Sequence, residues 1–259
     1  MATVEERAHN SFCDWSRWKG LLDPDGATLD ESGIIASAGS IDFPSSRSAI
    51  RSDFSLTGEQ WSEKVDAFFA ANGNTGCVHA RIDTDDDLTA PFLDRGFQEW
   101  TTLPEMVCDH VLEPRDAPAG VTVRFASSAD DISAYARVAA EAFGHLMLPE
   151  AATISAVDRP AAYLADNSAV ALAELDGVPV AGAHVLLCDE NRRGYVAWVS
   201  CADAARGRGL GDTVTRAVTN EAFRRGADLV SLEASPFGEH TYARMGYREI
   251  YRYRMLIRI

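Results

Sequence analysis

Hydrophobic and polar residues alternate in several short runs of the second half of the chain, and elsewhere in that half apolar residues recur at helical spacing. Alternation predicts strands at 121–125, 169–175, 178–188 and 194–201. Helical spacing predicts helices at 130–143, 150–164 and 210–225, followed by a strand (228–233), a short helix (237–245) and a strand (247–257). Ser128 or Asp130 is expected to cap the first helix. Strands and helices alternate after a meander of strands, which predicts an α/β fold with a mixed α+β sheet.

The segment 112–120 (LEPRDAPAG) holds two prolines and a glycine, which is typical of a linker between domains. Segments on the two sides of this linker resemble each other at a spacing of 150 residues. Residues 91–97 (PFLDRGF) and 241–247 (TYARMGY) both predict a helix that ends at a glycine before an aromatic strand start. A two-copy repeat favours a duplicated domain over a solenoid. We expect domains at 1–115 and 120–259.

The composition excludes several classes of protein. With 46% hydrophobic and 24% charged residues, the chain is typical of a globular protein rather than a disordered one. It has no apolar stretch of the roughly 20 residues that a membrane span needs, and its polar start is not typical of a signal peptide. Five scattered cysteines without a CxxC pair favour reduced thiols in the cytoplasm over disulfides or structural zinc.

The net charge of −15 is unevenly distributed, because residues 1–119 hold 9 Lys and Arg against 22 Asp and Glu. An acidic chain without a basic stripe is a poor partner for nucleic acid. Only two lysines accompany 22 arginines, which together with much alanine suggests a GC-rich, bacterial genome.

The most informative stretch follows the predicted strand that ends at Cys201. Residues 206–211 (RGRGLG) form a turn with three alternating glycines that opens a helix. Glycines allow close approach of a ligand, and the first N–H groups of a helix have no partner within it. The helix dipole also favours an anion there, so the turn predicts a pyrophosphate site.

Other interpretations of this turn remain. A glycine-rich turn between a strand and a helix is often only a tight connection. A dinucleotide fingerprint needs G-x-G-x-x-G early in a domain, whereas this run is G-x-G-x-G and comes late. A P-loop needs a G-K-[ST] ending, which this run lacks.

Here the sequence resembles a family. Arg206-x-x-Gly209-x-Gly211 is similar to the [QR]-x-x-G-x-[GA] acetyl-CoA motif of the GNAT (GCN5-related N-acetyltransferase) superfamily. The later stretches 232–235 (LEAS) and 241–247 resemble that family's next strand and its L-Y-x-x-x-G-[FY] helix end. The resemblance covers residues 120–259 and implies a GNAT fold in the C-terminal half, with a partial, degenerate GNAT-like domain before it.

The resemblance implies a set of residues that bind the co-substrate acetyl-CoA, or another acyl-CoA, without a metal. The strand before the turn would pair with the pantetheine arm, and the N–H groups of the turn would hold the pyrophosphate. The matching residues are Val199, Ser200, Cys201, Arg206, Gly207, Arg208, Gly209, Leu210, Gly211, Asp212 and Thr213. Asp212 departs from the expected pattern, because a carboxylate close to phosphate would repel it; its side chain is expected to point away. Ser235 stands where many relatives have an asparagine that helps to hold the cofactor.

The same resemblance implies direct attack of a neutral amine on the thioester, whose carbonyl is polarised by an N–H near Val199 or Cys201. Tyr242 matches the tyrosine that protonates the leaving thiolate; packing on the core is its alternative role. Glu233 is the first candidate for the general base, with an ion pair in the sheet as the alternative. His145, His184 and His240 are further candidates for the general base, although a single histidine more often has a structural role.

The first copy lacks this chemistry. Phe92 stands at the position of Tyr242 and has no hydroxyl, and residues 56–61 (LTGEQW) replace the glycine-rich turn. We therefore expect no cofactor there. The acidic run Asp83, Asp85, Asp86 and Asp87 is interpreted most simply as a solvated loop; a second hypothesis is that it attracts a cationic amine substrate.

We predict a cytoplasmic acetyl-CoA-dependent N-acetyltransferase that acts on a primary amine of a small molecule. A protein N-acetyltransferase and a non-catalytic acyl-CoA-binding regulatory module are the alternatives. No nucleic-acid or membrane partner is expected, and either a monomer or a homodimer fits. The sequence does not identify the amine acceptor or the length of the acyl chain.

Overall fold

The computed structural model describes residues 2–41, 43–145, 148–190 and 192–259 and divides the chain into two compact units. The first unit comprises Met1–Glu105, Ala234–Pro236 and Glu249–Ile259, and the second comprises Met106–Glu233 and Phe237–Arg248. Strand β5 (Gln98–Cys108) runs from the first unit into the second, and β11 (Arg248–Arg258) runs back into the first. Each unit therefore contains chain from both halves of the sequence.

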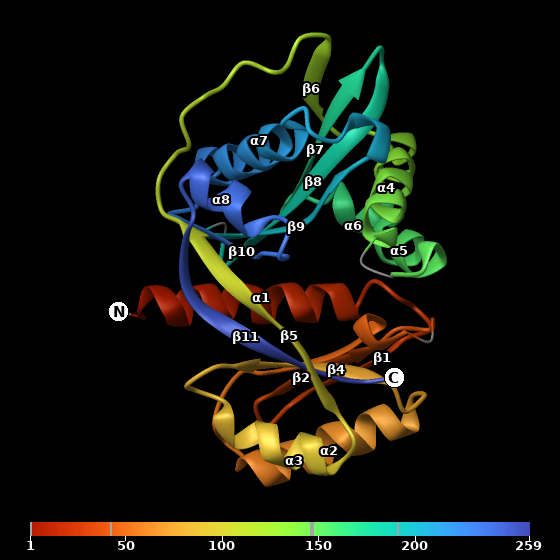
Figure 1. Ribbon diagram of the computed structural model, residues 1–259, viewed down its shortest axis with the longest axis vertical. Coiled ribbons are helices and arrows are strands. Elements are labelled where there is room, and N and C mark those ends of the chain that lie inside the picture. Colours follow the sequence, from red (N-terminus) through yellow and green to blue (C-terminus); the bar gives the residue numbers. More distant parts are fainter. Residues whose placement is uncertain (1, 42, 146–147, 191) are drawn as a thin grey trace. The chain divides into compact units, whose positions relative to one another are not determined.

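The second unit is a mixed sheet covered by helices. In chain order its elements are β6 (Val121–Phe125), α4 (Ala129–Gly144), α5 (Glu150–Val157), α6 (Pro160–Tyr163), β7 (Ser168–Leu175), β8 (Val178–Cys188), β9 (Arg193–Cys201), α7 (Leu210–Arg224), β10 (Leu229–Glu233) and α8 (Glu239–Met245) (Figure 1). Strands β6 to β9 are antiparallel neighbours in chain order, and β10 pairs parallel to β9. The predicted α/β class with a mixed sheet is confirmed.

The predicted helix at 150–164 is wrong in one respect, because the structure has two helices there, α5 and α6. Pro160 begins α6, and the residue before a proline is disfavoured in helical conformation. Arg159 accordingly has φ −130° and ψ 71°. At the start of α4, Ser128 is the cap, since its hydroxyl accepts from the N–H of Asp131 at 3.2 Å.

Helices α4 and α7 pack closely on β8 and β9 through two strand glycines. A Cβ at Gly182 of β8 would lie 2.5 Å from the Tyr135 ring of α4, and one at Gly194 of β9 would lie 3.1 Å from Ala222 of α7. The segment before β6 is also fixed within this unit. Leu112 is buried, and its N–H and carbonyl bond to the side-chain amide of Asn220 on α7 at 2.8 and 3.0 Å.

The first unit is also a sheet with helices on both faces. Its elements are α1 (Val4–Gly20), β1 (Ala27–Glu31), β2 (Ile34–Ala38), the 3₁₀ turn η1 (Pro44–Ser46), β3 (Arg47–Arg51), α2 (Gly58–Ala71), β4 (Gly76–Arg81), the 3₁₀ turn η2 (Asp86–Leu88) and α3 (Thr89–Asp94), together with most of β5 and β11. The strand order is β1-β2-β3-β4-β11-β5. On one face, Phe12 of α1 packs 4.9 Å from His79 and 5.0 Å from Tyr253, measured between ring centres. On the other face, the apolar core includes Trp61 and Phe69 of α2.

The 150-residue repeat extends through five consecutive elements. When 150 is added to its residue numbers, each of five elements of the first copy overlaps an element of the same type in the second copy. The pairs are β3 with β9, α2 with α7, β4 with β10, α3 with α8 and β5 with β11, and for β5 and β11 the bounds coincide. Both copies also join the first two strands of the repeat in parallel, β3 with β4 and β9 with β10. The first copy is therefore a partial version of the second.

Candidate active site

The turn between β9 and α7 is built on glycines in the left-handed region. After a 3₁₀ turn, η3 (Asp203–Ala205), Gly207 has φ 75° and Gly209, the N-cap of α7, has φ 78°. Side chains strongly disfavour this conformation, so glycine is needed at both positions. A Cβ at Gly207, Gly209 or Gly211 would meet no atom within 4 Å, which leaves open space over the turn.

The main-chain N–H groups of this turn lack partners. Among the described residues, none accepts a hydrogen bond from the N–H groups of 207–212, and Gly209 offers no side chain to cap α7. The first intrahelical acceptor is the Gly209 carbonyl, which bonds to the N–H of Thr213 at 3.1 Å. Several N–H groups at the positive end of one helix form a site for an anion such as a pyrophosphate.

Most of the charged side chains near the turn are paired with one another. The carboxylate of Asp212 is bonded to Arg216 one helical turn later, at 2.8 Å to Nε, so its charge is neutralised within α7. Arg206 pairs with Asp203 at 3.1 Å, and His145 contacts the same carboxylate at 2.8 Å. Arg208 is exposed and has no ion-pair partner in the described parts of the chain.

A β-bulge interrupts β9 just before the turn. Gly182 of β8 pairs with Ser200 and His184 pairs with Ala197, so Trp198 and Val199 together oppose the single residue between. Trp198 lies in the left-handed region with φ 54°, a conformation that a bulky residue adopts only when its surroundings enforce it. The Tyr135 hydroxyl donates to the Trp198 carbonyl at 2.8 Å, which holds the bulge against α4.

Strands β9 and β10 stop pairing before β9 reaches its bulge. Their parallel ladder pairs 193–195 with 229–231, and no ladder pair between them is described beyond Ser231. The Tyr195 hydroxyl instead accepts from the N–H of Glu233 at 3.2 Å. The edge of β9 that carries Val199, Ser200 and Cys201 is therefore left without β10, while Ser200 and Cys201 still pair with β8. An unpaired strand edge can take an extended ligand by backbone hydrogen bonding.

Tyr242 lies in α8 with its ring against the backbone of Gly238, since a Cβ there would be 2.7 Å from the ring. Its hydroxyl has no hydrogen-bond partner among the described residues. Burial raises the pKa of Tyr242 above its ordinary value, so the phenol keeps its proton at neutral pH. Glu233 is half-buried at the end of β10, and Ser235 is half-buried in the Ala234–Pro236 segment of the first unit.

The three candidate histidines and Cys201 have distinct surroundings. His184 is fully buried on β8, where its Nε2 lies 2.6 Å from the Ser168 hydroxyl, and burial lowers its pKa to about 3. It is therefore neutral at physiological pH and packed in the core. His145 and His240 are exposed. Burial raises the pKa of the Cys201 thiol, which disfavours the thiolate that a nucleophile needs.

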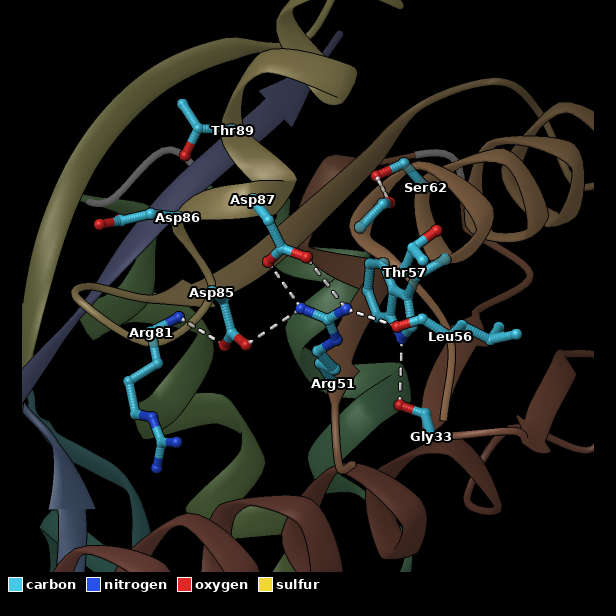
Figure 2. Close-up of polar contacts among 12 residues, drawn as sticks. Gly33, Arg51, Leu56, Thr57, Ser62, Arg81, Asp85, Asp86, Asp87 and Thr89 are labelled. Carbon is cyan, nitrogen blue, oxygen red and sulfur yellow. Dashed lines mark hydrogen bonds and ion pairs between the residues drawn. The ribbon is translucent and has the colours of Figure 1, made fainter. Parts of the chain in front are cut away.

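In the first unit, the start of α2 is occupied by the chain's own side chains (Figure 2). Thr57 and Gln60 form a capping box, and a carboxylate oxygen of Asp87 would lie 2.6 Å from a Cβ at Gly58. Arg51 binds that carboxylate at 2.7 Å and lies 3.6 Å from Asp85. Because Asp85 is only 2% exposed, the interpretation of this run as a solvated loop is wrong for that residue. The protein cations Arg51 and Arg254 offset the charges of Asp85, Asp86 and Asp87.

The fold and this site define an α/β protein in which a glycine-rich turn joins a bulged strand to a helix. Residues 134–247 match the family model described as "Acetyltransferase (GNAT) family". Similar solved structures, at identities that show the fold alone, include a GCN5-related N-acetyltransferase from Kribbella flavida (TM-score 0.70, 20% identity, covering 97% of this chain and 95% of that chain). Another is a GCN5-related N-acetyltransferase from Sphaerobacter thermophilus (0.62, 16%, 99% and 93%). A tandem GNAT protein from the clavulanic acid biosynthesis pathway is a third (0.64, 11%, 98% and 95%).

Residues 134–247 therefore form a GNAT domain, and the fold of almost the whole chain is similar to that of solved GNAT structures, one of them a tandem GNAT protein. The family match supports acyl transfer as the general chemistry of the C-terminal part. No match was found among curated proteins. In the described residues, no helix is both long and apolar enough to cross a membrane, and no group of three or more His, Cys, Asp or Glu side chains could hold a metal ion.

Proposed function

We propose that the second unit transfers the acetyl group of acetyl-CoA to the primary amine of a small molecule, by direct attack of the amine on the thioester. The observation that carries this proposal is the uncapped start of α7. Its N–H groups over 207–212 have no acceptor in the described chain, and the strand that leads into them has a free edge. A site for a diphosphate next to an edge for an extended arm fits the two parts of coenzyme A.

In this proposal the chain's own residues bind and orient the co-substrate. The N–H groups of 206–213 bind the pyrophosphate, and Val199, Ser200 and Cys201 pair with the pantetheine arm. The bulge turns the backbone at Trp198 and Val199, so that an N–H at Val199 or Cys201 polarises the thioester carbonyl. When bound, acetyl-CoA supplies the activated acyl group.

Two side chains handle the protons. Glu233, which lies where β9 and β10 separate, accepts a proton from the acceptor's ammonium group, directly or through water. The C–N bond then forms as the C–S bond breaks, Tyr242 gives its proton to the departing sulfur, and the second proton lost by the amine nitrogen restores the phenol, directly or through water. The raised pKa of Tyr242 keeps the phenol protonated at neutral pH. Because a thiolate is a weaker base than tyrosinate, this transfer depends on the positioning of the phenol and on its reprotonation by the amine.

The test is a thiol-release assay with acetyl-CoA over a panel of amino sugars, small amines and peptides, run beside calorimetric titration of CoA. We expect release with at least one small amine and none with peptides. Tyr242→Phe should lower kcat about 100-fold or more, the usual size of an acid–base contribution, with CoA affinity retained. The matched control is Tyr247→Phe, whose hydroxyl instead bonds to Thr219 at 2.7 Å and should leave kcat within about twofold.

Three outcomes would contradict the proposal in different ways. Binding of CoA without turnover on any amine would favour a regulatory module. Turnover on peptides alone would favour a protein acetyltransferase. No binding of CoA would remove the acyl-transfer proposal altogether.

A further inference from the structure

We infer that Arg81, with Tyr251 beside it, forms a binding site for a small carboxylate within the first unit, separate from the acyl-transfer site. Arg81 is the last residue of β4, and its main-chain N–H donates to Asp85 at 2.9 Å. Its guanidinium extends away from that carboxylate, toward the face of the sheet covered by α1 (Figure 2). It lies 5.5 Å from the centre of the Tyr251 ring.

The guanidinium of Arg81 contacts the Tyr251 ring and acts on the charge of Asp85 only at longer range. None of its three nitrogens forms a hydrogen bond or an ion pair with any described residue, and Nε is buried without an acceptor. Arg51, on the preceding strand β3, also has a buried Nε without an acceptor, but its terminal nitrogens bind Asp87 and the Leu56 carbonyl at 2.7 and 2.8 Å. A buried polar atom without a partner is unusual in a native fold and requires an explanation. A ligand that accepts hydrogen bonds is one.

The groups around Arg81 are held neutral by their own hydrogen bonds. The Arg51 carbonyl can only accept, so His9 Nε2, 2.8 Å away, carries the imidazole proton. Burial, with the nearby charge of Arg81, lowers the pKa of His9 to about 4, so Nδ1 is bare and accepts from the Tyr253 hydroxyl at 2.9 Å. The Tyr253 oxygen then accepts from Tyr251 at 3.2 Å. These neutral groups carry no charge that offsets the guanidinium, so Asp85 is the carboxylate whose charge Arg81 meets here.

This chemistry favours a carboxylate over a phosphate. One guanidinium presents a planar pair of donors that matches the two oxygens of a carboxylate. Arg81 would supply a single positive charge, because the neighbouring Arg51 is bound to Asp87 and Asp85, and two acidic groups lie nearby. Asp85 binds the main chain of Arg81, and the charge of Glu105 contributes to the raised pKa of Tyr251. These charges would repel a dianion more than a monoanion. The aromatic ring of Tyr251 gives an apolar wall for the body of the ligand.

The experiment compares benzoate and acetate with their neutral isosteres benzamide and acetamide, by calorimetry and by the ¹⁵N signal of arginine Nε groups in the full chain. We expect saturable binding of at least one of the two carboxylates, a shift of the Arg81 Nε signal and no binding of either amide. In Arg81→Gln the affinity for that carboxylate should fall at least tenfold. The control Arg192→Gln, which removes an exposed arginine whose side chain is 68% accessible, should bind the carboxylate like the wild type.

Equal binding of acids and amides, or an unchanged affinity in Arg81→Gln, would overturn the inference. So would the absence of binding by both carboxylates. The comparison of acid with amide on the wild-type chain needs no variant, so it remains decisive if Arg81→Gln does not fold. Because none of these measurements uses turnover or CoA, a failure here is distinct from a failure of the proposed acyl transfer.

Discussion

The substitution Arg51→Gln tests how the acidic run in the first unit is stabilised. The Arg51 side chain is 1% exposed and that of Asp85 is 2% exposed, with 3.6 Å between the closest charged atoms. Removing one partner of a buried ion pair leaves the other charge uncompensated, which typically costs about 3–5 kcal/mol. We therefore expect Arg51→Gln to lower the free energy of unfolding of the first unit by about 3 kcal/mol, since glutamine can still donate to the Leu56 carbonyl.

The matched control is Arg254→Gln on β11. Arg254 pairs with Asp86 at 3.1 Å and Glu99 at 3.3 Å, but these carboxylates are 57% and 52% exposed. Exposed pairs contribute about 0–1 kcal/mol, so this variant should unfold close to the wild type. Urea unfolding by tryptophan fluorescence and circular dichroism measures both. A loss of 3 kcal/mol corresponds to a shift of the midpoint by about 1 M or more.

The pH dependence of the stability loss in Arg51→Gln tests whether the uncompensated charge of Asp85 causes that loss. Burial raises the pKa of Asp85, while Arg51 and Arg81 oppose that rise, so the pKa rises further when Arg51 is removed. A carboxyl whose pKa is higher in the folded state binds its proton there first, so lowering the pH favours the folded state. The deficit of Arg51→Gln should therefore be larger at pH 7 than at pH 5. A deficit no larger than that of Arg254→Gln, or one that grows toward pH 5, would refute this reasoning.

Three further predictions concern the second unit. Gly209→Ala should weaken CoA binding about tenfold, because a side chain at φ 78° costs about 1–2 kcal/mol, whereas Gly211→Ala, outside the left-handed region, should retain binding in the same titration. Tyr135→Phe removes the 2.8 Å bond to the Trp198 carbonyl, so it should cost about 1 kcal/mol of stability and raise the KM for acetyl-CoA. For His184, the pKa is about 3 in the folded state and 6.5 ordinarily, so the unfolded state binds the proton first and wild-type stability falls as the pH drops below 6.5. Relative to His184→Gln, unfolding curves should show the wild type losing about 2 kcal/mol from pH 7 to pH 5.

Local sequence signals predicted most of the second unit. The strand at 178–188 has the predicted bounds, and the predicted α7 start at Leu210 is also observed. These elements depend on alternation and on glycine punctuation, which the chain carries locally. The break between α5 and α6 was missed although its signal, Pro160, is in the sequence.

Other parts of the site depend on contacts that no local pattern contains. The bulge at Trp198 depends on the register of β9 against β8, and a tryptophan gives no indication of a left-handed conformation. Its anchor, Tyr135, lies 63 residues earlier on α4 and was not a candidate. The burial of Asp85 likewise requires Arg51, from a strand that precedes α2. Residue types at a spacing therefore predicted the turn but not the strand geometry that leads into it.

The two copies of the repeat show how the same helix start can be closed or left open. In the first copy, Thr57 and Gln60 cap α2, and the carboxylate of Asp87 lies beside its first residue. In the second, Gly209 begins α7 without a side-chain cap, and the one acid of the first turn, Asp212, is bound to Arg216. A helix start needs acceptors for its free N–H groups, from its own chain or from outside. Because α7 has none of its own in the described chain, its first N–H groups are open to water or to an external anion such as the diphosphate proposed above.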